Sequence, residues 1–153
     1  MLGLSMTSTL NTIILDDLKS DAAHLFDKML AAGQRHKFVS FLTRHNYRLL
    51  DLGSYPSQLT CGHDVGQREV ALDNIRGTEG RLSDFDSRFN PLTDQARRRW
   101  ISVARAKEEG MDLPPVELIQ VGDVYFVRDG HHRVSVARAY GQTTITARVI
   151  VKD

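Results

Sequence analysis

The sequence predicts a mixed α/β protein in which a helical N-terminal part precedes an α/β domain. Apolar residues recur at helical spacing before residue 50, whereas β-type and helical patterns take turns after residue 66. The 153 residues are 41% hydrophobic and 25% charged, as is usual for globular proteins, so the chain can bury one core. We expect a flexible lead-in over residues 1–15, a helical hairpin over 16–50, a linker over 51–66 and the α/β domain over 67–153.

Two helices are predicted in the N-terminal part. The first spans about residues 16–32, with two aspartates in its first turn and Gly33 as its stop. Its apolar residues at helical spacing are Leu18, Ala22, Leu25, Phe26 and Met29. The second spans about residues 34–45 and ends before Asn46, a residue type that tolerates the left-handed conformation. Together the two helices would form the hairpin.

The next segments predict the first half of the α/β domain. Glycines and Pro56 interrupt every period in the linker, so it can hold at most one short helical turn. Residues 68–72 can form a strand, and residues 77–90 are a loop rich in glycine, aspartate and arginine. A helix over residues 91–109 follows, and its apolar spacing turns Trp100 toward the core.

The last third of the chain predicts a hairpin, a helix and a final strand. Residues 116–121 and 124–127 have β-propensity and are separated by Gly122-Asp123, which is the pattern of a two-residue β-hairpin. A short helix over residues 131–140 begins directly after the hairpin and is closed by a glycine. Residues 143–151 alternate as a strand does.

Charge and cysteine content restrict the class of function. Lys and Arg number 20 and Asp and Glu number 19, so the net charge of +1 gives no global field toward nucleic acid or membrane. The single cysteine, Cys61, excludes an intrachain disulfide. The N-terminus lacks the features of a signal peptide, and no stretch is apolar enough to span a membrane. We therefore expect a cytoplasmic protein without a membrane partner, in which any phosphate binding is local.

The turn Asp129-Gly130-His131-His132-Arg133 is the candidate site. It lies between a predicted strand and a predicted helix, where free backbone N–H groups and the helix dipole favour an anion. Gly130 permits a tight turn and a close ligand, and Arg133 can offer a bidentate guanidinium to phosphate oxygens. From the local pattern alone, a plain turn with solvated histidines explains the residues equally well.

A wider resemblance favours the phosphate site. The stretch from Val70 to Val149 resembles the ParB/sulfiredoxin superfamily, which binds nucleotide phosphate with a glycine-basic motif at the start of a helix. The segment Gly130-His131-His132-Arg133 is similar to the second family box, Gly-Glu-Arg-Arg in ParB proteins and Gly-Cys-His-Arg in sulfiredoxins. The segment Gly80-Arg81-Leu82-Ser83-Asp84-Phe85 is similar to the first box, and a predicted helix separates the two boxes in the family's order.

The resemblance implies a role for each matching residue. Gly130 takes the glycine position, His132 and Arg133 the phosphate-contacting pair, and Arg81 the first-box arginine. The local motif is also similar to the Asp-Gly-His-Thr-Arg motif of ParB-like free serine kinases, which would place Asp129 and His131 near a transferred phosphate. Those kinases use an acidic residue in the upstream loop, for which Glu79 is the candidate.

Departures from the family pattern limit what the resemblance implies. His131 stands where sulfiredoxin has its reactive cysteine, and Cys61 lies outside the matching stretch, so sulfiredoxin-type reduction is not expected. His131 and Ser135 replace the glutamate and a further arginine of the ParB box, so CTP preference does not transfer. A family member of nuclease type would need clustered acidic metal ligands, which the sequence does not display.

The predicted function is binding of a nucleotide of the ATP, ADP or CTP class, or of another phosphorylated small molecule. Phosphotransfer or nucleotide hydrolysis would then use Mg²⁺ that bridges the phosphates, held with help from Asp84, Asp129 or Glu79.

Two alternatives remain open on the sequence. The basic run of residues 97–99, with Arg105 and Lys107, could serve a DNA-associated or protein-interaction module, although such a run is usually a solvated helix face. The second alternative is a metal site formed by Cys61, His63, His131 and His132, which is disfavoured because their spacing is not that of a known zinc motif.

Overall fold

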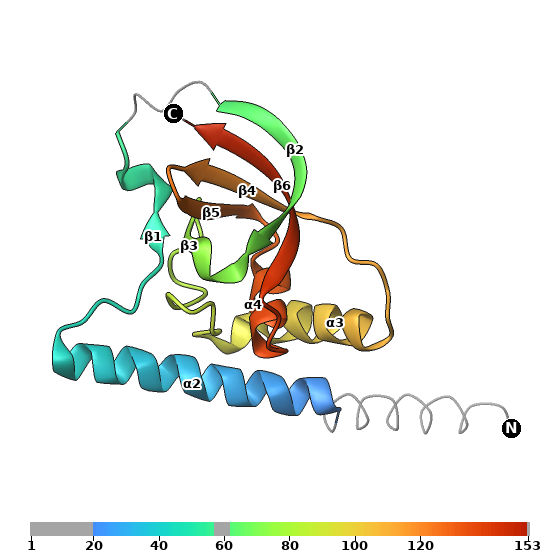
Figure 1. Cartoon of the computed structure of the whole chain (residues 1–153). Coiled ribbons are helices and arrows are strands. Elements are labelled where there is room, and N and C mark those ends of the chain that lie inside the picture. The colour runs from blue at the N-terminus through green and yellow to red at the C-terminus, as the bar shows by residue number, and fades with distance from the viewer. Residues whose placement is uncertain (1–19, 57–61, 153) are drawn as a thin grey trace, which may run out of the picture.

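The computed structural model describes residues 20–56 and 62–152, and within them the chain forms a six-stranded mixed sheet with helices on one side (Figure 1). The helices are α2 (Asp21–Thr43), α3 (Arg97–Glu108) and α4 (His131–Ala139). The strands are β1 (Leu50–Asp51), β2 (Gly62–Ala71), β3 (Ile75–Thr78), β4 (Val116–Val121), β5 (Val124–Asp129) and β6 (Thr144–Lys152). Short 3-10 turns occupy Leu52–Ser54, Leu72–Asn74 and Asp94–Ala96.

The strand order β1-β3-β5-β4-β6-β2 combines parallel and antiparallel pairs. β4 and β5 form the predicted antiparallel hairpin, in which Val121 pairs with Val124 across the turn. β3 pairs in parallel with β5, β4 pairs in parallel with β6, and β2 runs antiparallel to β6. The predicted mixed α/β class is therefore confirmed.

The core lies between the sheet and the helices. Trp100 on α3 is fully buried, as its spacing predicts, and its ring meets Phe26 of α2 edge-on with centroids 5.6 Å apart. Its indole Nε1 donates to Ser135 Oγ on α4 at 2.8 Å. The Trp100 side chain thus connects α3 to both α2 and α4. None of the helices among residues 20–56 and 62–152 is long and apolar enough to cross a membrane.

The predicted helical hairpin is wrong, because α2 is a single helix that passes straight through Gly33. Its N-terminus is capped by Ser20, whose Oγ accepts from the Ala23 N–H at 3.2 Å, and it ends at Arg44 in the left-handed conformation. A Cβ on Gly33 would lie 2.3 Å from Pro91 O, so this glycine permits close packing against the loop before α3. The expected lead-in over residues 1–15 lies outside the described residues.

The predicted linker is too long and the predicted loop begins too early. β2 starts at Gly62, inside the expected linker over 51–66, and Gly66 at φ 81° sits where the β2–β6 register shifts. β3 overlaps the start of the loop expected over 77–90. Its Gly77 breaks the sequence pattern, yet a Cβ there would lie 2.2 Å from the Phe126 ring. These two glycines therefore lie within strands and do not mark turns: Gly66 lies at a register shift, and Gly77 permits close contact with the Phe126 ring.

Replacing Gly33 with alanine should destabilise the protein. Alanine has the higher helix propensity by about 1 kcal/mol, but the clash with Pro91 O should cost more, since overpacking typically costs about 1–3 kcal/mol. Thermal denaturation of Gly33→Ala beside Gln34→Ala, an exposed neighbour on the same helix, measures the difference. A higher melting temperature for Gly33→Ala would contradict the packing role.

Candidate functional site

An open cleft of about 610 Å³ lies where the loop after β3, helix α3 and the β5–α4 junction meet. Its charged lining residues other than the two histidines are Arg81, Arg98, Arg99, Arg128, Arg133 and Asp129. The lining thus holds five guanidinium groups and one carboxylate, and two further carboxylates outside the lining, Asp84 and Glu79, pair with Arg81 and Arg128. The cleft is therefore strongly basic in a chain whose net charge is only +1.

The β5–α4 junction has a backbone that only glycine fits. Gly130 has φ 101°, and a Cβ there would lie 2.6 Å from Val116 Cγ1. The first turn of α4 closes with Val134 N–H donating to Gly130 O at 3.0 Å, and no side chain caps the helix. The earlier N–H groups of the helix have no intrahelical acceptor, so the start of α4 is a positive dipole end on the cleft wall.

His131 is a buried neutral imidazole. Its Nε2 lies 2.6 Å from Thr78 Oγ1, which also accepts from the Arg81 backbone N–H at 3.3 Å, so the Thr78 hydroxyl can donate to the ring. The ring stacks on Phe85 with centroids 6.4 Å apart. Burial, and then the neighbouring charges of Arg81 and His132, lower the pKa of His131 to about 4. The ring is therefore uncharged at neutral pH.

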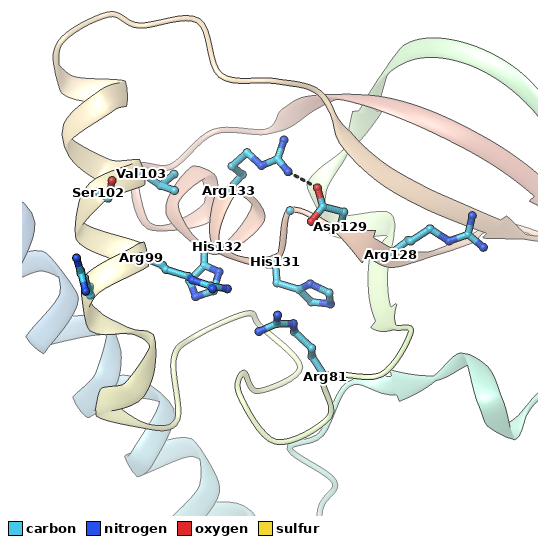
Figure 2. Close-up of a pocket in the computed structure, with 11 residues that line it drawn as sticks. Arg81, Arg99, Ser102, Val103, Arg128, Asp129, His131, His132 and Arg133 are labelled. Carbon is cyan, nitrogen blue, oxygen red and sulfur yellow. Dashed lines mark hydrogen bonds and ion pairs between the residues drawn. The ribbon is translucent and has the colours of Figure 1, made fainter.

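His132 lies between two arginines. Burial lowers the pKa of its imidazole below the usual value, and Arg81 and Arg99 lower it further. Figure 2 shows the side chains of Arg81, Arg99, His131 and His132 directed toward a shared space. Two imidazoles are thus held uncharged partly because Arg81 carries a positive charge beside both of them.

Arg133 is largely engaged by the protein itself. Its Nη1 donates to the carbonyl oxygens of Pro114 and Pro115 at 2.7 and 2.9 Å, and its Nη2 pairs with Asp129 Oδ2 at 2.7 Å. Its side chain is only 15% exposed, and in Figure 2 it points to Asp129 and away from Arg81. In this conformation Arg133 braces the loop before β4 while forming one wall of the cleft.

The sequence-predicted residues line one cleft, with the exceptions of Glu79 and Asp84. Arg81, Gly130 and the histidines line the cleft together with Asp129 and Arg133. Glu79 does not line it, and instead pairs with Arg128 at 2.9 Å between Oε2 and Nε. Asp84 lies beside the site and pairs with Arg81 at 3.3 Å.

Arginines of α3 complete the site, and sequence reasoning assigned them to a solvated helix face. Arg98 and Arg99 line the cleft, and within the described part of the chain neither has an ion-pair partner. Arg97 turns the other way and pairs with Asp27 of α2 at 2.5 Å. Helical spacing gave a signal for this, since Arg98 and Arg99 share faces with Ser102 and Val103, which also line the cleft.

The alternative metal site gains no support from the described residues. Among residues 20–56 and 62–152, no group of three or more histidine, cysteine, aspartate or glutamate side chains could hold a metal ion. Cys61, one of the four residues considered, lies outside these ranges.

Lowering the pH should destabilise the fold through His131. Its folded pKa of about 4 lies below the usual histidine pKa of 6.5, so the unfolded chain binds the proton more readily. The stability is present above about pH 6.5 and is lost as the pH falls toward 4, by on the order of 3 kcal/mol. Urea denaturation between pH 7 and pH 4 should give a smaller loss for His131→Gln than for wild type. An unchanged pH dependence in His131→Gln, matching the exposed control His24→Gln, would contradict this assignment.

Comparison with known proteins gives one structural similarity. No protein-family model matches the chain, and no curated protein matches it significantly. Among solved structures, sulfiredoxin from Arabidopsis thaliana is similar, with 19% sequence identity over 54% of this chain and 82% of that chain. The TM-score is 0.40. At that TM-score the similarity carries no argument about family membership, activity or ligand.

Proposed function

We propose that the cleft binds a nucleotide or another phosphorylated small molecule. The observation that carries the proposal is the charge of the lining, in which five arginines face the single carboxylate of Asp129, itself paired with Arg133. Its volume of about 610 Å³ lies in the usual range of small-molecule sites, roughly 300–1,000 Å³. A bound phosphate would offset the like charges that the protein holds together there.

The contacts divide the arginines by role. Arg99 has no carboxylate partner among the described residues, and Arg81 has one exposed pair at 3.3 Å, so both are free to turn to a ligand. The start of α4 adds backbone N–H donors to the same side. Arg133, with its carbonyl and carboxylate partners, is a positioning residue that holds the Gly130 turn against the loop before β4.

Phosphotransfer or hydrolysis is a further step of the same proposal. Asp84 and Asp129 each pair with a cleft arginine and could help to hold Mg²⁺ that bridges the ligand's phosphates. Such an ion would lower the phosphate charge and orient the phosphoryl group. His131 is uncharged, so it could accept a proton there after a ligand has changed its surroundings.

Binding of a small molecule is favoured over the DNA-associated alternative. Arg97 is paired with Asp27 and Asp94, and Arg98 and Arg99 line a cleft, so the basic run does not form one exposed stripe. DNA binding would release counterions and weaken steeply as salt is raised. A nucleotide in the cleft would show a shallower dependence on salt.

Removing one cleft arginine should weaken nucleotide binding at least tenfold. Isothermal titration calorimetry with ATP, ADP and CTP, with and without Mg²⁺, would compare wild type with Arg99→Ala. A charge-assisted hydrogen bond contributes about 1.5–3 kcal/mol, and each 1.4 kcal/mol is about tenfold in affinity. The control is Arg68→Ala, an exposed arginine on the edge strand β2. Equal losses in both variants, or no binding to wild type, would refute the proposal.

A bound phosphate should raise the pKa of His132. The cations of Arg81 and Arg99 now lower it, and a nearby anion would offset them. NMR titration of the imidazole carbons with and without saturating ligand measures the shift, and His24 serves as the exposed reference. By linkage, affinity should increase as the pH falls through the His132 pKa of the complex. A His132 pKa that stays unchanged would place the ligand elsewhere.

A further inference from the structure

A second arginine cluster lies at the other end of α4. Arg48, Arg76 and Arg138 line a separate cleft of about 590 Å³, together with the polar side chains of Asn46 and Ser87. These residues come from the segment after α2, from β3, from the last turn of α4 and from the loop that also carries Arg81. None of them lines the first cleft.

Arg138 is a half-buried cation that has one long ion pair, with Asp73, and that also feels the charge of Asp86. Its Nη2 donates to the carbonyl oxygens of Leu72 and Ile75, and the nearest carboxylate oxygen, Asp73 Oδ1, is 4.0 Å from its Nη1. The Asp73 side chain is 98% exposed, so water screens that pair. The Arg138 Nε is buried and has no hydrogen-bond partner within the described ranges. Such a group is costly unless an anion accompanies it.

The other two arginines, Arg48 and Arg76, are exposed and contact only neutral groups within the described part of the chain. Arg76 Nε donates to Asp73 O at 3.2 Å, which holds its guanidinium over the turn before β3. The Arg48 guanidinium lies over the Tyr47 ring, 5.8 Å from its centroid, and the Arg48 backbone N–H donates to Asn46 Oδ1 at 2.9 Å. Neither arginine has an ion-pair partner in residues 20–56 and 62–152.

The lining charges specify the ligand. Among the lining residues, three guanidinium groups and the carboxylate of Asp73 leave an excess of two positive charges, which complements a dianion. Asp86 also acts on Arg138, but it is not in the lining, and its carboxylate binds His36 and backbone N–H groups. Guanidinium forks match the geometry of phosphate oxygens, and Asn46 and Ser87 can add neutral hydrogen bonds. We propose that this cleft is a second anion site, which binds a dianionic phosphoryl group, free or carried on a larger molecule, between Arg48, Arg76 and Arg138. The site does not depend on the function proposed for the first cleft.

The test uses inorganic phosphate at constant ionic strength with the full chain. Amide and arginine Nε signals in ¹H–¹⁵N NMR spectra should shift saturably at Arg76, Ser87 and Arg138. In Arg81→Ala/Arg99→Ala protein, the shifts at this cleft should persist while those at the first cleft are lost. That difference separates a failure of this proposal from a failure of the proposed function.

A second variant tests the arginines directly. Arg48→Ala/Arg76→Ala changes two exposed side chains and leaves Arg138, which anchors the turn before β3, in place. Binding of phosphate at this cleft should weaken at least tenfold, whereas Arg68→Ala should leave it unchanged. Unsaturable shifts, or shifts that survive the double substitution, would overturn the proposal. Tighter binding of citrate than of phosphate, or a response to duplex DNA alone, would overturn the phosphoryl assignment.

Discussion

The position of the first cleft depends on one buried chain of hydrogen bonds. Trp100 Nε1 donates to Ser135 Oγ at 2.8 Å, and Ser135 Oγ donates to Phe89 O at 2.6 Å. The three residues belong to α3, α4 and the loop after β3, which are the segments that bring Arg99, the histidines and Arg81 to one place. A partner left unsatisfied in this interior would cost about 1–3 kcal/mol, so the three segments are held in register together.

The loop that carries Arg81 is fixed by a buried carboxylate. Asp86 is fully buried, and its Oδ1 accepts the backbone N–H groups of Arg88 and Asn90 at 2.9 and 2.8 Å. Its Oδ2 lies 2.8 Å from His36 Nδ1, which comes from α2. The N-terminal helix therefore has a role that its sequence does not reveal. Through His36 it holds the loop that carries Arg81 and forms one wall of the basic cleft.

The sequence was informative where local rules decide the structure. The β4–β5 hairpin, the helix after Gly130 and the burial of Trp100 follow from turn chemistry and periodicity, and the structure confirms them. Gly33 led to the wrong prediction of a helix end. In a sequence, a glycine that ends a helix cannot be distinguished from one that permits a tertiary contact, here with Pro91. Likewise, the sequence cannot distinguish an arginine that donates to backbone carbonyls, as Arg133 does, from an arginine that is free to bind phosphate.

The two edges of the sheet differ in their exposure to other chains. β1 at one edge has two residues, whereas β2 at the other has ten, and its outer side has no strand partner within the described residues. A long free edge invites a strand from another molecule. The bulge at Gly66 interrupts this edge, and Asp64, Arg68 and Glu69 are exposed along it. A bent and charged edge is a poor template, which protects the chain against edge-to-edge polymerisation.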